Sequence, residues 1–150
     1  MRIFGVFLIS IIPMIIGVKK YMILLNKTNI IKQIFALSNR LLDQIKYSQK
    51  ELYYILKKEN EDFFVFSNPI VLNLEYFTQN GFKTEEISKI EEFLKALQSG
   101  DRSYINSQGN IHLKEIEILK DHFEKELKNT GKLYITVFSG LSAVIFLALI

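Results

Sequence analysis

Two uncharged apolar segments, one at each end of the 150-residue chain, constrain its fold more than any other feature. Residues 3–18 and 133–150 contain no acidic or basic side chain, whereas the sequence between them carries nearly all of the charge. An 18-residue helix rises about 27 Å, close to the hydrocarbon thickness of a membrane. We therefore predict a transmembrane helix at residues 133–150. A buried core helix is the alternative, but the rest of the chain is too short to cover it on all sides.

The N-terminal apolar segment is shorter and contains Pro13. It could be a signal peptide, a short or tilted span, or an interfacial anchor. A cleaved signal is disfavoured because only Met1 and Arg2 precede the apolar run, and because Lys19, Lys20 and Tyr21 follow it in place of small residues. We predict that residues 1–18 form a retained membrane anchor, either as a full span or as a shorter one.

Basic residues beside the apolar segments predict the orientation of the chain in the membrane. Residues 19–40 carry five basic side chains and no acidic one. We therefore expect residues 19–132 in the cytosol and both termini on the outer side. The side chains predicted at the membrane interface are Lys19, Lys20, Lys128, Lys132 and Tyr134.

The segment at residues 19–132 predicts an all-α domain, a small antiparallel helical bundle whose first and last helices continue into the membrane segments. Apolar residues at three- and four-residue steps indicate helices near residues 28–56 and 110–132. A break is expected in the first near Ser48, and only Gly131 should interrupt the last before the membrane span. Asn68-Pro69 and Asn80-Gly81 predict the limits of a second helix. Thr84 is the expected N-cap of a third helix, which should end at Gly100. Its apolar positions predict a core face of Ile87, Ile90, Phe93, Leu94 and Leu97.

Two stretches of this domain lack a helical pattern. Residues 101–110 are mostly polar and predict a loop, while Phe63–Phe66 is an apolar run open to either strand or helix. No second strand-like segment is evident, so we predict helix or loop for this run.

Sequence features that carry chemistry are sparse. The absence of cysteine excludes disulfides, thiolate catalysis and cysteine metal sites, and the isolated glycines form no phosphate-binding loop. The balanced charge of the middle segment, without a basic stripe, disfavours nucleic acid as a partner. His112 and Glu115 have a spacing that can share a metal ion, but one such pair more often lies on a solvated helix face. We predict no enzymatic activity, cofactor, metal or small-molecule substrate.

Several strings at the ends of predicted helices occur together in one known family. They are Gly131-Lys132-Leu133-Tyr134 followed by Gly140-Leu141; Leu97-Gln98-Ser99-Gly100-Asp101-Arg102 followed by Gln108; and Ile45, Tyr47, Leu52 and Leu56 of the first helix. With these strings and its layout, the chain resembles the stage III sporulation protein AB family. Gln98 and Gly100 stand where that family has a glycine and a serine.

The resemblance implies a scaffold, or platform, in a sporulation-specific, secretion-like machine between mother cell and forespore. It implies a protein of the mother-cell membrane around the forespore. Its helical domain would be cytosolic and similar to the cytosolic domains of type II secretion platform proteins. The implied partners are an assembly ATPase and the machine's other membrane subunits. Asp101, Arg102 and Gln108 are then candidate partner contacts, and a polar turn capped by Asp101 is the alternative.

A different class of function is consistent with the same composition and periodicity. The chain could be a membrane-tethered sensory or regulatory adaptor that relays a signal to a soluble protein, in which case we expect expression in growing cells. A membrane-disrupting role is disfavoured by the size and charge balance of the middle segment.

Overall fold

The computed structural model describes residues 2–47, 55–57, 62–67, 69–99 and 101–149, and most of these residues are helical. The chain divides into two compact units. We call Met1–Thr28 with Phe123–Ile150 the hairpin unit, and Asn29–His122 the domain unit. Helices α1 (Arg2–Tyr47) and α5 (Arg102–Glu126) each contribute residues to both units. The predicted continuity between the apolar ends and the first and last domain helices is thus confirmed.

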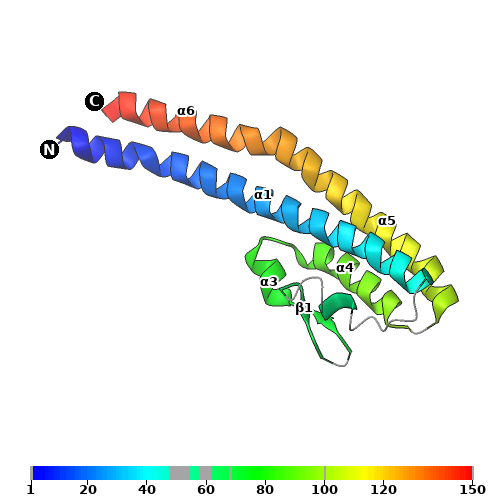
Figure 1. The fold of residues 1–150 in the computed structure, drawn as a ribbon. Coiled ribbons are helices and arrows are strands. Elements are labelled where there is room, and N and C mark those ends of the chain that lie inside the picture. The colour runs from blue at the N-terminus through cyan, green and yellow to red at the C-terminus, as the bar shows by residue number, and fades with distance from the viewer. Residues whose placement is uncertain (1, 48–54, 58–61, 68, 100, 150) are drawn as a thin grey trace. The chain divides into compact units, whose positions relative to one another are not determined.

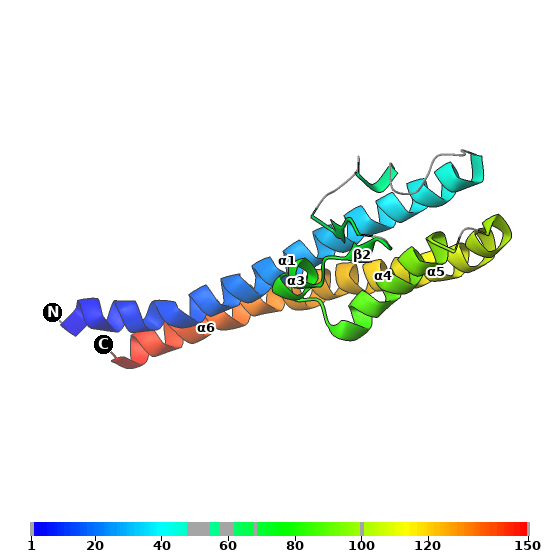
Figure 2. The same cartoon turned by 90° about the horizontal axis from the view of Figure 1, so that it is seen from below.

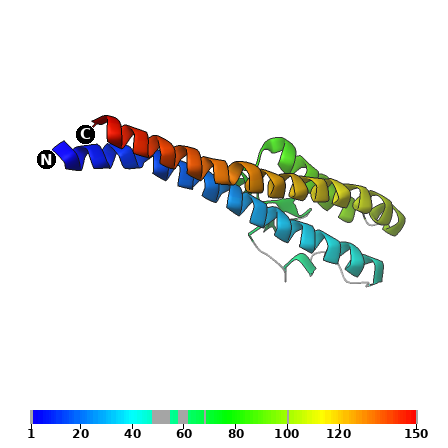
Figure 3. The same ribbon diagram turned by 90° about the horizontal axis from the view of Figure 1, so that it is seen from above.

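The hairpin unit consists of the N-terminal part of α1, the last residues of α5, a π-helical turn η1 (Leu127–Gly131) and α6 (Lys132–Leu149). Figures 1 and 3 show α1 and α6 side by side, with the two chain termini at the same end. The Met14 backbone N–H donates a hydrogen bond to Ser142 Oγ at 3.2 Å, which ties the two helices together. The helices of the hairpin unit are therefore antiparallel.

A glycine permits the close approach of these two helices. A Cβ atom at Gly17 would lie only 2.6 Å from Phe138 Cβ and 3.0 Å from the Tyr134 carbonyl oxygen. Hydroxyl groups on α1 bond within the helix, because Ser10 Oγ donates to the Phe7 carbonyl and Thr28 Oγ1 to the Leu24 carbonyl. Such internal bonds allow polar residues to lie in an apolar segment.

The outward surface of the hairpin unit is apolar. The two long helices that contain the apolar ends are both apolar enough to cross a membrane. Of the 18-residue apolar stretch of each, among the described residues, 17% is buried near the N-terminus and none near the C-terminus. The exposed large apolar residues of α6 are Leu133, Ile135, Val137, Leu141, Val144, Leu147 and Leu149. Burial in a protein core, the alternative for residues 133–150, is therefore not observed within the described chain.

The domain unit combines helices with a small β-hairpin. Strand β1 (Phe64–Val65) pairs antiparallel with β2 (Val71–Leu72), and β2 and helix α3 (Leu74–Gln79) both contact α4 (Thr84–Leu97). Figure 2 shows this hairpin, α3 and α4 gathered in one region. Phe63 and Phe77 are almost fully buried, and their ring centroids lie 6.0 Å apart.

The β-hairpin corrects the prediction of helix or loop for Phe63–Phe66. Phe64 faces Leu72 and Val65 faces Val71 across the pair; the first two are buried and the valines are exposed. Each strand has only two residues, too few to reveal the alternation that identifies a strand from sequence. The predominantly helical fold is confirmed, with this hairpin as an addition.

The second predicted helix was wrong at its start and right at its end. It begins at Leu74 rather than after Asn68-Pro69, because β2 intervenes and Asn73 acts as the cap by accepting a hydrogen bond from the Tyr76 backbone at 3.2 Å. It ends at Gln79 with Asn80 as its C-cap, followed by Gly81 with a positive φ of 83°. Only a glycine adopts that backbone conformation without strain.

The third predicted helix is confirmed as α4, with shifted limits. Its N-cap is Lys83 rather than Thr84, and the Lys83 backbone donates to the Glu86 carboxylate at 2.7 Å. The helix ends at Leu97, before the predicted Gly100. All five predicted core residues, Ile87, Ile90, Phe93, Leu94 and Leu97, are buried.

The predicted loop at residues 101–110 is wrong, because α5 already begins at Arg102. Asp101 caps the helix by accepting a hydrogen bond from the Ser103 backbone at 2.9 Å. Ile105 and Gly109, four residues apart, are buried on one helical face. A Cβ at Gly109 would lie 2.6 Å from a Leu42 methyl group, so the glycine admits close packing between α1 and α5.

The remaining boundaries concern the first and last helices. The first predicted helix was to reach Leu56 with a break near Ser48; α1 ends at Tyr47, residues 48–54 lie outside the described chain, and residues 55–57 are helical. At Gly131, where an interruption was expected, the chain forms the π-helical turn and continues directly into α6.

Candidate functional site

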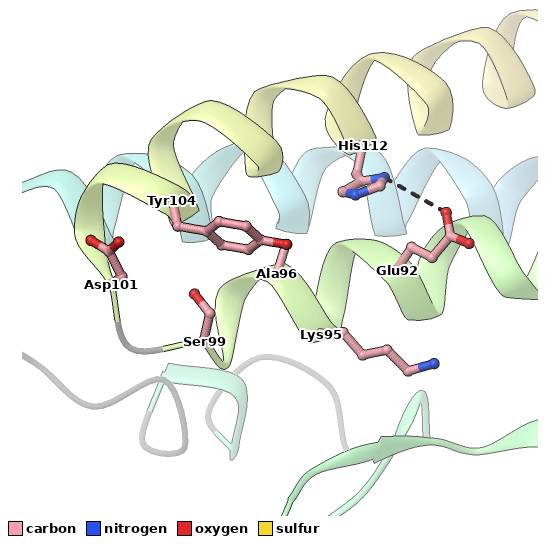
Figure 4. Close-up of a pocket in the computed structure, with 7 residues that line it drawn as sticks. All are labelled: Glu92, Lys95, Ala96, Ser99, Asp101, Tyr104 and His112. Atoms are coloured by element: carbon pink, nitrogen blue, oxygen red, sulfur yellow. Dashed lines mark ion pairs between the residues drawn. The ribbon is translucent and has the colours of Figure 1, made fainter.

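The domain unit carries an open groove of about 590 Å³ between α4 and the start of α5. Figure 4 shows the residues that line it: Glu92, Lys95, Ala96, Ser99, Asp101, Tyr104 and His112. Polar and ionisable side chains predominate, with one aromatic ring among them. A mixed lining of this kind offers both polar and apolar contacts to a partner.

Helical periodicity explains how α4 contributes to the groove. Glu92, Lys95, Ala96 and Ser99 recur at three- and four-residue steps and thus share one side of the chain. Ala96 is small and buried at the floor, and the Tyr104 ring from α5 extends toward it. The groove therefore exists because a short side chain stands where a larger one would fill the space between the helices.

A histidine lies between two carboxylates at one end of the groove. His112 Nδ1 is 3.0 Å from Glu115 Oε2 on the same helix and 3.8 Å from Glu92 Oε2 on α4. The His112 side chain is 19% exposed, and the glutamates are more open. Within the described residues, these three side chains form the one group whose ligand atoms could hold a metal ion.

The predicted partner contacts fall into different places. Asp101 is exposed and lines the groove, but its carboxylate also caps α5. Arg102 is exposed and lines a separate cavity of about 160 Å³ with Leu42, Ile45, Ile105 and Asn106. Gln108 is half-buried on α5. The structure therefore does not bring the three candidates together, and the capping alternative for Asp101 is observed.

The predicted membrane-interface residues all belong to the hairpin unit. Lys20 Nζ lies 5.6 Å from the centroid of the Tyr134 ring and 5.6 Å from that of Phe138, a cation–π arrangement between α1 and α6. Lys19, Lys128 and Lys132 are exposed. Lys20 and Tyr134, which are far apart in sequence, are thus brought together.

A second lysine of the hairpin unit is buried. Lys27 is 7% exposed, and its Nζ lies 4.2 Å from the centroid of the Phe123 ring. An aromatic face attracts an ammonium group electrostatically, and most strongly where water is excluded. Lys27 therefore links the two arms of the hairpin unit. The sequence shows Lys27 only as one of several basic residues near the membrane segment.

Gln98 has a structural role that the sequence did not indicate, because its side chain bridges α4 and the β-hairpin region. Its amide accepts a hydrogen bond from the Ile70 backbone N–H at 3.1 Å and donates one to the Ile70 carbonyl at 2.9 Å. The contact of Glu92 with His112 was not predicted either, because it depends on how two helices pack. The spacing of polar residues on α4 was the one signal available.

Comparison with models of protein families, with curated proteins and with solved structures finds no match. Function is therefore inferred from the residues of this chain and their arrangement. Two features stand out: a helical hairpin with an apolar outer surface, and a domain with a polar groove and a histidine–carboxylate cluster.

Proposed function

We propose that the chain is a membrane-anchored scaffold. In this proposal α1 and α6 cross the membrane as a hairpin, and the domain unit lies in the cytosol and binds protein partners. The observation that carries it is the packing of two apolar helices against each other while their outer faces stay apolar. Uncovered apolar surface of this extent is stable in lipid and unfavourable in water.

The dimensions of the hairpin support a span. From Leu133 to Leu149 α6 rises about 26 Å, and from Gly5 to Lys19 α1 rises about 23 Å. Lys20 and Tyr134 lie together where the apolar stretch of α1 ends and that of α6 begins. Basic and aromatic side chains are favoured at the boundary between lipid and water, so this pair is a natural marker of the cytosolic interface.

The wider role rests on the family resemblance. We propose that the scaffold belongs to a sporulation-specific, secretion-like machine in the mother-cell membrane, similar in its domain to type II secretion platform proteins. An assembly ATPase and other membrane subunits are its proposed partners.

Deleting the gene tests this role. We expect heat-resistant spore counts to collapse while vegetative growth stays normal, with recovery when the full chain is restored. Normal sporulation would overturn the sporulation role. A growth defect in its place would favour the membrane-tethered regulatory adaptor.

Partner binding can be tested at the groove. Tyr104 is 47% exposed and lines it, so Tyr104→Ala should reduce recovery of the ATPase with the detergent-solubilised chain from sporulating cells. Ile118→Ala is the matched control, because Ile118 is 59% exposed on the same helix and is not among the groove residues. Equal recovery with both variants would exclude the groove as the contact surface.

A further inference from the structure

The cluster at the end of the groove combines nitrogen and oxygen donors from two helices. His112 and Glu115 come from α5, and Glu92 comes from α4. Their three ligand atoms all lie within 4.8 Å of one another. The sequence shows only the pair on α5, which by spacing alone is unremarkable; the third side chain is a feature of the folded domain.

The distances approach those of a tetrahedral site. With metal–ligand bonds of about 2.0–2.2 Å, two ligands of a tetrahedral ion lie roughly 3.3–3.5 Å apart. The observed separations from His112 Nδ1 are 3.0 Å to Glu115 and 3.8 Å to Glu92, which bracket that value. Both separations therefore lie within about 0.5 Å of the value for a bound ion, and the two carboxylates lie within 4.8 Å of each other.

The charge of the cluster favours a cation. Two carboxylates lie near the same imidazole nitrogen, and a proton on that nitrogen can be donated in a linear hydrogen bond to only one of them. Even a protonated His112 leaves one negative charge in excess. Lys95, the lysine of the groove, extends away from His112 (Figure 4), and Lys114 on α5 pairs with Glu117 at 2.7 Å.

We infer that Glu92, His112 and Glu115 bind a divalent transition-metal ion, with zinc as the ion best matched to the donors. Imidazole with carboxylates suits zinc, whereas calcium and magnesium take oxygen ligands almost exclusively. Three protein ligands leave a fourth position. Because Glu92 and His112 both line the groove, water or a partner side chain reaches that position from the groove. A bound ion also ties α4 to α5.

The test uses the full chain, purified in detergent without a polyhistidine tag and stripped of metal. Co²⁺ is titrated in while its visible absorption is recorded, and Zn²⁺ is then added to displace it. We expect one ion per chain. His112→Ala should weaken binding by at least about tenfold, since even indirect partners of metal ligands contribute that much. Glu92→Gln should weaken it with little effect on folding, because Glu92 is 54% exposed.

His122→Ala is the matched control, because His122 is the other histidine of the chain and is exposed on the same helix. It should bind as the unaltered chain does. The inference is overturned if the unaltered chain binds no ion, or if His112→Ala and Glu92→Gln both bind normally. Equal loss in His122→Ala and His112→Ala would also overturn it, since that result indicates adventitious surface histidines. Circular dichroism of each variant separates lost binding from lost folding.

Discussion

Replacing Gly17 with alanine should loosen the hairpin unit. The new Cβ would lie 2.6 Å from Phe138 Cβ, and ordinary contacts at such positions begin at 3.4 Å. Both atoms are fixed to their helix backbones, so rotation of a side chain cannot separate them. The helices must therefore move apart by about 0.8 Å, the difference between the two distances.

The cost follows from lost packing. A gap of roughly 0.5–1 Å removes about a quarter to a half of the dispersion energy of each contact. Overpacked sites of this kind typically lose about 1–3 kcal/mol. If the arms of the hairpin open together, this cost should raise the population of the open form about 5- to 140-fold, at 1.4 kcal/mol per factor of ten.

A single cysteine can report that opening, because the chain has none of its own. Thr28 is fully buried, and its Oγ1 lies 3.4 Å from the Phe123 carbonyl oxygen on the other arm. In a Thr28→Cys background, a maleimide should modify the thiol only when the hairpin opens. Under conditions where closing is faster than labelling, the labelling rate follows the open population and should rise 5- to 140-fold in Gly17→Ala, the range given above.

Two controls make the test specific. Gly5→Ala should leave the labelling rate unchanged, because within the described chain nothing lies within 4 Å of a Cβ at that position. Phe138→Gly removes the clashing Cβ but also removes packing, so it serves as a second background: there, Gly17→Ala should raise the labelling rate much less than it does in the otherwise unaltered chain. A labelling rate in Gly17→Ala equal to that of Gly5→Ala, or an effect that Phe138→Gly leaves untouched, would refute the close contact.

Two further predictions concern the domain unit. Gln98→Ala should lower the free energy of unfolding of the domain unit by about 1–3 kcal/mol, because the substitution removes both hydrogen bonds of the amide. Gln79→Ala is the control and should cost less, because Gln79 lies on an exposed helix end. Denaturant titration in detergent compares the two variants. Burial, with the nearby Asp62 carboxylate, raises the pKa of Tyr76 above its ordinary value of 10.0. The folded state therefore favours the neutral Tyr76 hydroxyl, and this contribution to stability is complete below pH 10 and is lost as the pH rises through the raised pKa. Tyr76→Phe has no hydroxyl to ionise and should lose less stability between pH 9 and pH 11 than the unaltered chain.

Hydrophobic periodicity predicted the helices that bury whole faces, and it failed where structure depends on tertiary contacts. The helical pattern of α4 is clear in the sequence because each of its five predicted core positions is apolar and buried. The start of α5 looks polar, yet Ile105 and Gly109 are buried on it, and a glycine carries no hydrophobic signal. Gly109 allows close packing against Leu42 of another helix, and no local sequence pattern predicts that contact.

The candidate site divides in the same way. Asp101 was identified as exposed and as a possible cap, because both properties follow from local sequence. Asp101, Arg102 and Gln108 were expected in one loop, but α5 begins at Arg102 and helical geometry directs its residues to different sides. Their contact with a partner stays a prediction. Glu92 meets His112 across two helices, a contact that only the fold specifies.

The central claim, a membrane hairpin with a cytosolic domain, can be tested directly by labelling single cysteines. Gln79→Cys probes the exposed end of α3, and a cysteine added after Ile150 probes the C-terminus. The chain is expressed in the cell membrane of a Gram-positive host that does not sporulate and treated with a membrane-impermeant maleimide. The proposal predicts that intact cells label the C-terminal cysteine and label Gln79→Cys only after lysis. Labelling of Gln79→Cys in intact cells would contradict it.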